Sequence, residues 1–472
     1  MKGKKAPSFG YSACTLAILA IFMVVGLRIL KAPLNVVAFL AWLLVNLLAL
    51  KLGYKYVELE KIALDTVRNS LQAVVIMLAV GALIGTYIAS GTVPMIIYYG
   101  LKIVNARFFL VTALLLCSLV SMCTGTSWGT MGTIGVALLG VGAGLGVPVG
   151  MAAGAIISGS WFGDKLSPLS DTTNFAAGVM GVNVMTHVRH MFYTTIPSLA
   201  ASAVIFLFMG FHVSGTTANF KLIDQISSGL SSNFHLGIIT LFPMALVVFL
   251  LLRKKVPAQS ILIGVVSAML IAVFYQHFDT STVFTSFYNG FAGKFKQDYL
   301  ITLLNRGGMN SMNSTVQVVI FTTGIGGMIR EMGVIRVLVT EFSKKIKSTL
   351  GLVASAMGVS YLSIGLTGSH MFAAIMVQST MLDLFKSKGL KPENASRICE
   401  DCGTLGVTLI PWGVTAIFIM NTFNISFSAY APYAVFCYLC PIMSLICGAT
   451  GWGIARYSDE EMKQISMEEG IL

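Results

Sequence analysis

Long apolar runs recur along the whole chain and restrict what it can fold into. A helix needs about 20 residues to cross the hydrocarbon core of a bilayer. Runs of about this length lie at residues 11–27, 33–52, 71–89, 108–123, 191–211, 235–252, 258–276, 315–329, 350–366 and 430–454. Only 11% of the residues are charged and the mean hydropathy is +0.82, whereas soluble domains carry about 25% charged residues. These features predict an all-α polytopic membrane protein with about 10 to 14 membrane-embedded segments.

The net charge of +12 does not indicate a nucleic-acid partner, because the lysines and arginines lie in short loops between the apolar runs. Basic loops of this kind set the orientation of a membrane protein and face the cytoplasm. The apolar runs make the lipid bilayer the expected partner. We expect a multi-pass protein of the cell membrane with both termini in the cytoplasm. The chain has no Walker A motif and no recognisable set of nucleophile and base. We therefore expect neither an ATP-driven pump nor an enzyme, and no bound cofactor.

A polar segment at 163–173, GDKLSPLSDTT, interrupts the apolar pattern. No Asp, Glu, Lys or Arg lies between Phe108 and Gly163, so Asp164 falls deep within a hydrophobic stretch. A charge at bilayer depth costs roughly 2.5 to 3.5 kcal/mol even on lenient insertion scales, and usually marks an ion or proton pathway. We therefore predict unwound backbone at this segment, with a cation site built around it.

The predicted site binds sodium and protons in turn. Asp164 and Asp171 supply negative charge, with Asp171 ranked first as the carrier, and neutral oxygens complete the shell because hard cations prefer oxygen ligands. The predicted ligands are Asp164, Ser167, Asp171, Thr172, Thr173, Asn174, Thr124, Thr126 and Ser127. Two structural alternatives stay open. Asp164 could pair with Lys165 or with a cation on another helix, and Asp171 could cap a half-helix that begins near Phe175.

The two halves of the chain match at an offset of 243 to 244 residues. Thr124-Gly125-Thr126 falls on Thr367-Gly368-Ser369, Pro168 on Pro411, and Val74-Val75-Ile76 on Val318-Val319-Ile320. The shared order and spacing indicate an internal duplication. The basic loops predict that the two repeats are inverted, an architecture that secondary transporters combine with discontinuous helices and re-entrant hairpins. We place the first repeat at 1–220, a connector at 221–231, the second repeat at 232–456 and a short acidic tail at 457–472.

Polar side chains of the second half are candidates for the same site. They are Thr367, Ser369, His370, Glu400, Asp401, Thr404 and Thr408. Because Glu400 and Asp401 follow Arg397, an interfacial salt bridge is an equally good interpretation of these acids. His187 and His190 are candidates for pH sensing, since imidazole titrates near neutral pH. The alternative for the histidines is a cluster at the membrane surface.

The segments FGDKLSPLSDTTN (162–174) and HVRHMFYTTIPS (187–198) resemble the NhaC family of sodium/proton antiporters. Similar segments lie at 90–101, 124–130, 396–401 and 409–412, so the resemblance covers most of the chain. It implies a two-repeat ion-transporter fold, a homodimer and exchange of sodium for protons. A malate and proton versus sodium and lactate antiporter belongs to the same family. Cys402, His370 and Gly413 depart from the family pattern, where serine, glutamine and asparagine are usual.

Two functions therefore compete. In sodium/proton antiport by alternating access, both cations compete for the embedded aspartates, so exchange needs no further machinery. In the alternative, a small organic acid or amino acid is carried with sodium or proton coupling. Proton release that sodium induces in vesicles without any organic solute is expected only from the first function.

Overall fold

The computed structural model describes residues 4–68, 70–213, 220–253, 255–295, 297–343, 346 and 348–462. Within these ranges the chain is helical and has no β-strand, apart from one isolated bridge between Leu390 and Arg456. Five of the described helices are long and apolar enough to cross a membrane, and up to nine spans result if each of four bent helix pairs counts as one. The prediction of an all-α polytopic membrane protein is confirmed.

The N-terminal half contains α1 to α12. Their bounds are α1 Phe9–Val24, α2 Leu34–Leu50, α3 Tyr56–Arg68, α4 Leu71–Ala89, α5 Thr92–Ile103, α6 Phe109–Thr124, α7 Ser127–Thr130, α8 Val136–Gly144, α9 Val149–Leu166, α10 Asp171–Val179, α11 Val184–Val213 and α12 Phe220–Asn233. Short π-helical turns at Val25–Ile29 and Met131–Gly135 extend α1 and join α7 to α8. The connector predicted at 221–231 is thus part of α12.

The C-terminal half contains α13 to α24. Their bounds are α13 Phe242–Leu252, α14 Pro257–Phe274, α15 Thr280–Tyr288, α16 Asp298–Leu304, α17 Asn313–Glu331, α18 Val334–Ser343, α19 Thr349–Thr367, α20 His370–Ser387, α21 Pro392–Ile398, α22 Val414–Phe423, α23 Phe427–Tyr430 and α24 Val435–Thr450. A π-helix at Cys399–Thr404 and a 3-10 turn at Val407–Leu409 continue α21. Short 3-10 turns also lie at Ile238–Leu241, Met309–Met312 and Ala431–Tyr433. Residues 463–472 of the predicted acidic tail lie outside the described residues.

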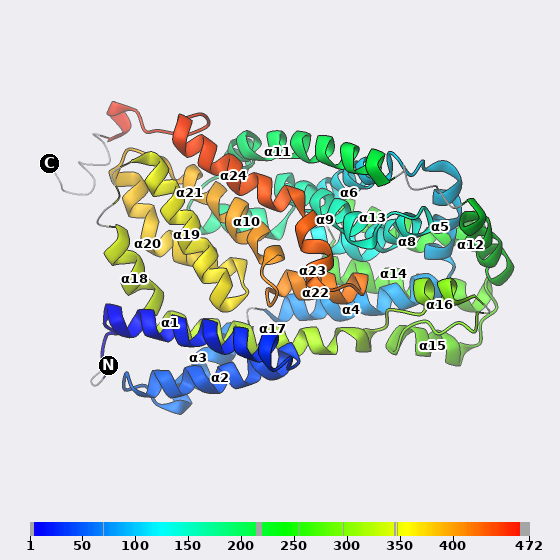
Figure 1. Ribbon diagram of the computed structural model, residues 1–472, viewed down its shortest axis with the longest axis horizontal. Helices are drawn as coiled ribbons and strands as arrows, with labels where there is room; N and C mark the ends of the chain where they lie inside the picture. The colour runs from blue at the N-terminus through cyan, green and yellow to red at the C-terminus, as the bar shows by residue number, and fades with distance from the viewer. Residues whose placement is uncertain are drawn as a thin grey trace.

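The helices form an elongated bundle (Figure 1). α1, α2 and α3 lie along one edge, where α2 and α3 pack against α17, and α11 runs along the opposite edge. The start of α1 and the end of α24 lie at the same end of the long axis. α9, α10, α20 and α22 lie between the two edges, and their ends build the site described below.

Helices in the two halves begin and end at equivalent positions. α6 ends at Thr124 and α19 at Thr367, while α10 begins at Asp171 and α22 at Val414. Members of each pair are 243 residues apart, the same spacing that the sequence motifs have. The shared helix breaks support the predicted duplication; the repeat boundaries and the inversion of the repeats stay predictions.

A left-handed glycine ends the first helix at each equivalent break. Gly125 has φ +70° after α6 and Gly368 has φ +64° after α19, a backbone conformation that residues with a Cβ atom rarely adopt. The side chains of Thr126 and Ser369 then cap α7 and α20 by accepting backbone N–H groups. The matched motifs TGT and TGS therefore each end one helix and begin the next.

The break after α9 is shorter than predicted. α9 continues as a helix through Asp164 and Lys165 to Leu166, and only residues 167–170 separate it from α10. The prediction of unwound backbone at Asp164 was therefore wrong. Helix persists there because the side chain of Lys165 has an acidic partner on another helix, Asp401. Asn174 stabilises the short break by donating hydrogen bonds to the carbonyl oxygens of Pro168 and Ser170.

Two glycines let α9 approach α6 closely. Gly159 and Gly163 are four residues apart on one face of α9, the small-xxx-small spacing that brings membrane helices together. A Cβ atom at Gly163 would collide with backbone atoms of Ser118 and Met122 in α6. This contact fixes the end of α9, and so fixes the position of Asp164, the next residue.

We expect Gly163→Ala to lower the free energy of unfolding by about 1–3 kcal/mol, because the new methyl group overpacks a backbone contact. Thermal unfolding of the purified protein in detergent measures the change. Gly178→Ala is the matched control, since a Cβ atom there meets nothing within 4 Å. Equal unfolding temperatures for the two variants would contradict the close packing of α6 and α9.

Candidate functional site

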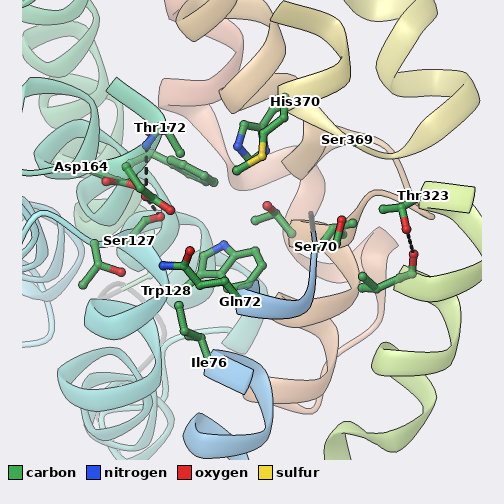
Figure 2. Close-up of a pocket in the computed structure, with 17 residues that line it drawn as sticks. Ser70, Gln72, Ile76, Ser127, Trp128, Asp164, Thr172, Thr323, Ser369 and His370 are labelled. Carbon is green, nitrogen blue, oxygen red and sulfur yellow. Dashed lines mark hydrogen bonds between the residues drawn. The ribbon is translucent and has the colours of Figure 1, made fainter. Parts of the chain in front are cut away.

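A cavity of about 100 Å³ lies where helix breaks of both halves meet (Figure 2). Its lining combines two carboxylates with hydroxyl, amide and aromatic side chains. The lining residues are Ser70, Gln72, Ile76, Thr126, Ser127, Trp128, Trp161, Asp164, Asp171, Thr172, Val319, Thr323, Ser369, His370, Met371, Val414 and Thr415.

Much of this lining comes from equivalent positions of the two halves. Residues 126–128 and 369–371 all line the cavity, as do 171–172 and 414–415. Each match has the offset of 243 residues. The chemistry of the matched positions differs, because Asp171 is replaced by Val414 and Ser127 by His370. The cavity is therefore built from related segments, but both of its carboxylates come from the first half.

Asp164 is the buried carboxylate of the cavity. Its side chain is only 2% exposed, and Oδ2 accepts a hydrogen bond of 2.6 Å from the hydroxyl of Ser127, the first residue of α7. Oδ1 has no hydrogen-bond partner among the described residues. An ionised carboxylate in this position is costly unless a cation or proton neutralises it. Asp164 therefore has the chemistry of a group that binds a cation or a proton.

Asp171 lies at the mouth of the site and is exposed. It is the first residue of α10, where the helix dipole favours a negative charge, and its Oδ1 accepts the backbone N–H of Thr172 at 3.0 Å. The alternative in which Asp171 caps a half-helix beginning near Phe175 does not hold, because α10 begins at Asp171 itself and its cap is Ser170, which accepts the backbone N–H of Thr173. Asp171 is thus free to add charge to the cavity.

The second half contributes Ser369 and His370 to the cavity wall. Both stand at the start of α20, next to the left-handed Gly368. The Nε2 atom of His370 is buried and has no hydrogen-bond partner among the described residues. His370 thus offers the cavity a polar group in the position where the first half has Ser127.

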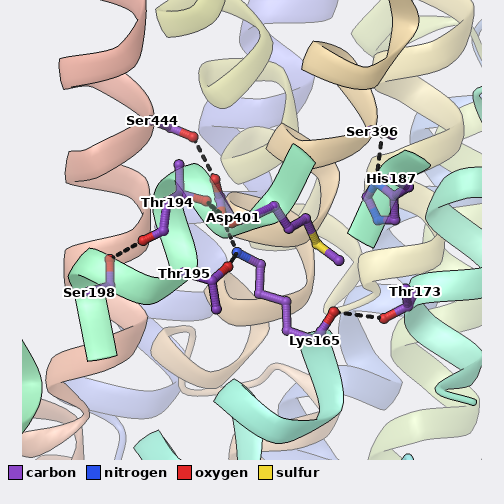
Figure 3. A network of polar contacts seen from close by, with 10 residues as sticks. Lys165, Thr173, His187, Thr194, Thr195, Ser198, Ser396, Asp401 and Ser444 are labelled. Atoms are coloured by element: carbon purple, nitrogen blue, oxygen red, sulfur yellow. Dashed lines mark hydrogen bonds and ion pairs between the residues drawn. The ribbon is translucent and has the colours of Figure 1, made fainter. Parts of the chain in front are cut away.

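The residue beside Asp164 belongs to a second polar network (Figure 3). Lys165 is fully buried and forms an ion pair with Asp401, which is also fully buried. Lys165 donates a further hydrogen bond of 2.9 Å to Thr195, while Asp401 accepts hydrogen bonds from Thr194 at 3.1 Å and Ser444 at 2.6 Å. The network ties α9 of the first half to the π-helix of the second half.

These contacts argue against three of the structural alternatives that the sequence left open. Asp164 does not pair with Lys165, because Lys165 pairs with Asp401. Glu400 and Asp401 are fully buried rather than interfacial, and neither carboxylate oxygen of Glu400 has a hydrogen-bond partner among the described residues. His187 and His190 are buried as well, with His187 Nδ1 2.8 Å from the Ser396 hydroxyl, so the alternative of a cluster at the membrane surface was wrong.

Several other predicted residues lie outside the cavity wall. They are Thr124, Ser167, Thr173, Asn174, Thr367, Glu400, Asp401, Thr404, Thr408, His187 and His190. Many of them serve the backbone instead: Thr367 donates to the carbonyl of Ser363 and Thr173 to that of Lys165. Thr404 is buried at the end of the π-helix Cys399–Thr404, and Thr408 is buried in the 3-10 turn Val407–Leu409.

Sequence reasoning missed other residues of the wall. They are Ser70, Gln72, Ile76, Trp128, Trp161, Val319, Thr323, Met371, Val414 and Thr415. Two signals could have found some of them. Trp128 stands inside the TGTSWGT segment, and Ile76 and Val319 belong to stretches that repeat between the halves.

Comparison with known proteins identifies the family of the chain. The model of the Na+/H+ antiporter family matches residues 159–452. The chain is 37% identical over 423 residues to the malate-2H+/Na+-lactate antiporter of Bacillus subtilis, covering 89% of this chain and 90% of that protein. It is 33% identical over 455 residues to the Na+/H+ antiporter NhaC of Alkalihalophilus pseudofirmus, covering 96% and 98%.

A third relative has an organic substrate in its name. The chain is 30% identical over 479 aligned positions to the arginine/ornithine antiporter ArcD of Halobacterium salinarum, covering 98% of this chain and 96% of that protein. These relatives are all transporters. From the family match and from identities of this level over nearly the whole chain, it follows that the protein belongs to the Na+/H+ antiporter family.

Proposed function

We propose that the protein exchanges Na+ for H+ by alternating access, and that Asp164 carries either ion. One observation carries this assignment: Asp164 is nearly fully buried in a cavity, and one of its two carboxylate oxygens has no hydrogen-bond partner in the part of the chain that the structure describes. A buried carboxylate without a counter-ion gains most from whichever cation reaches it. Because one group serves both ions, binding of sodium displaces the proton and binding of the proton displaces sodium.

Oxygen atoms around Asp164 suit sodium. Asp164, Asp171 and Thr172 line the cavity together with the hydroxyl groups of Thr126 and Ser127, and hard cations prefer such ligands. The sequence ranked Asp171 above Asp164, but the burial of Asp164 reverses this order. Asp171 then raises the local concentration of cations at the entrance, and Asp164 binds the ion that is transported.

The proposed setting of this exchange is the cell membrane, with both termini in the cytoplasm and with the two halves as inverted repeats. A homodimer, and pH sensing by His187 and His190, stay predictions that the sequence alone supports. Both histidines are buried in the structure.

Proteoliposomes test the function directly. The protein is reconstituted with a pH-sensitive dye and an imposed proton gradient, and Na+, Li+, K+ and organic solutes are added separately. Sodium alone is expected to dissipate the gradient. If only an organic solute does so, sodium/proton antiport is refuted.

We expect Asp171→Asn to weaken the apparent affinity for sodium by up to about fivefold while exchange persists, because an exposed charge contributes roughly 1 kcal/mol to cation binding. The sodium concentration for half-maximal dequenching measures this. Loss of all exchange in Asp171→Asn would instead make Asp171 the carrier, as the sequence ranking predicted.

A second candidate function is transport of an organic solute, which the names of two relatives favour. Malate and lactate are anions, and anion sites normally contain arginine or lysine. Among the described residues, the cavity wall contains neither arginine nor lysine, which favours a cation as cargo over an organic acid. Uptake of labelled malate, lactate and arginine by the same proteoliposomes separates these alternatives.

A further inference from the structure

A second cavity, of about 480 Å³, lies between α8, α12 and α16 and the ends of α9 and α22. It shares no lining residue with the Asp164 cavity. We propose that this second cavity binds the phosphate group of an anionic phospholipid, and that Arg306 is the residue that recognises the phosphate. The proposal does not depend on the exchange of sodium for protons.

Arg306 lines the second cavity and lacks a counter-ion. Its Nε donates a hydrogen bond of 3.2 Å to the carbonyl oxygen of Leu303, whereas Nη1 is buried and has no hydrogen-bond partner among the described residues. Within the same ranges no carboxylate forms an ion pair with Arg306. Burial lowers the pKa of Arg306 to about 10, so the guanidinium is charged at neutral pH. A buried charge without a partner is costly, and an anion in the cavity would remove that cost.

The backbone holds Arg306 in place before any ligand binds. The next two residues, Gly307 and Gly308, have φ +86° and +84°, and the Gly308 N–H donates a hydrogen bond of 2.7 Å to the carbonyl oxygen of Gly81 in α4. A Cβ atom at Gly307 would collide with the backbone of Gly85, one turn further along α4. The loop is therefore fixed against α4, which lowers the entropy cost of binding a ligand through Arg306.

Other donors face the same space. α9 begins at Val149, which lines the cavity, and no side chain caps its first turn. Free backbone N–H groups at the start of a helix attract anions. Asn424, the left-handed residue after α22, adds a side-chain amide to the lining. α8 and α22 end at the cavity, but N–H groups of the following turns bond to carbonyl groups in their last turns. The described lining contains no Asp or Glu, so the cavity favours an anion.

The rest of the lining and the place of the cavity indicate a lipid as the source of the phosphate. Leu139, Ile226 and Phe423 give the cavity an apolar wall beside Arg306. α12 and α16 lie at the end of the long axis opposite the start of α1 (Figure 1), where a membrane-spanning bundle meets the lipid head groups. A free phosphate has five heavy atoms and leaves most of 480 Å³ unfilled. A phospholipid fills the apolar part as well, and basic pockets between membrane helices bind lipid head groups.

Thermal unfolding of the purified full-length protein in detergent tests this proposal. Phosphatidylglycerol, phosphatidylcholine with the same acyl chains, and inorganic phosphate are titrated separately. Phosphatidylglycerol is expected to raise the unfolding temperature, because a ligand stabilises the folded protein that binds it. Phosphatidylcholine has no net negative charge and free phosphate has no apolar part, so both should give a smaller shift at equal concentration. Equal stabilisation by either of them overturns the choice of an anionic lipid.

Variants of Arg306 test the site itself. Arg306→Gln is expected to need at least about tenfold more phosphatidylglycerol for the same shift, because charge-assisted hydrogen bonds are lost. Without lipid it should be as stable as the wild-type protein, since it removes a charge that has no counter-ion. Arg306→Lys keeps the charge but loses the planar fork, and should fall between the two. Arg253→Gln, which removes an exposed arginine at the end of α13 outside the cavity, is the matched control and should respond as the wild-type protein does.

Native mass spectrometry counts the bound lipids directly. Wild-type protein is expected to retain a phosphatidylglycerol molecule that Arg306→Gln loses and Arg253→Gln keeps. Equal retention by Arg306→Gln and the wild-type protein, or equal losses in Arg306→Gln and Arg253→Gln, would overturn the site. Neither measurement involves sodium or protons, so the result is independent of whether the protein exchanges these ions.

Discussion

Asp164→Asn is expected to abolish sodium-driven proton release while leaving the protein folded. Asparagine has the shape of the protonated acid and can still accept the hydrogen bond from Ser127, but it cannot release a proton or balance the charge of sodium. Sodium in the buried site of the variant would have no carboxylate to balance its charge, a loss of several kcal/mol by analogy with a broken buried ion pair, so the rate at low sodium should fall at least about 100-fold. Dequenching in proteoliposomes measures this loss.

Stability gives a second readout for the same variant. Because Asp164→Asn removes a buried charge that lacks a full set of partners, the variant without sodium is expected to unfold at the same temperature as the wild-type protein or higher. Sodium should stabilise the wild-type protein and have no effect on the variant, since a ligand stabilises only the protein that binds it. Asp279→Asn is the control: this exposed aspartate caps α15, and asparagine caps helices equally well. Near-normal exchange by Asp164→Asn would refute the assignment.

The helix breaks could be predicted from the sequence because local chemistry determines them. A glycine between hydroxyl residues produces a left-handed turn followed by a capped helix, and the same pattern at Gly125 and Gly368 gave both positions. The spacing of the motifs likewise matched the helix ends of the two halves. These features depend on residues that are close together in the chain.

The ranking of the two aspartates and the course of α9 could not be predicted in this way. Whether Asp164 or Asp171 is buried depends on how α9 packs against α6. It also depends on where the first residues of α20 and α22, which line the other side of the cavity, come to lie. The helix continues through Lys165 because Asp401 on another helix neutralises the lysine. Asp401 is 236 residues away in sequence. No local pattern at GDKLSP contains that information, so the segment was interpreted as unwound when it is mostly helical.

The buried pair of Lys165 and Asp401 leads to the second large effect. We expect Lys165→Met to lower the free energy of unfolding by about 3–5 kcal/mol, because it leaves Asp401 charged and without its counter-ion in the interior. Thr194 and Ser444 still donate hydrogen bonds to Asp401, but two neutral donors do not replace a buried ammonium group. Thermal unfolding and gel filtration of the purified protein in detergent measure the loss.

Removing the second charge should restore stability. In Lys165→Met combined with Asp401→Asn, no uncompensated charge remains, and replacing a buried ion pair by neutral groups is often neutral or stabilising. The asparagine can still accept a hydrogen bond from Ser444 and reach Thr194. The double variant is therefore expected to be more stable than Lys165→Met alone, a non-additive result that a double-mutant cycle quantifies.

An exposed pair in the same protein provides the matched comparison. Lys391 and Glu461 lie 2.7 Å apart, but their side chains are 28% and 43% exposed, and such pairs contribute about 0–1 kcal/mol. Lys391→Met should therefore change stability far less than Lys165→Met does. If the two single variants were equally stable, or if Asp401→Asn gave no rescue, the ion pair would not join the halves of the protein as the structure indicates. A much larger loss of stability in Lys165→Met than in Lys391→Met would mean that the charge of Lys165 holds α9 in place. Lys165 would then not neutralise Asp164, and the carboxylate of Asp164 would be available to bind the exchanged ion.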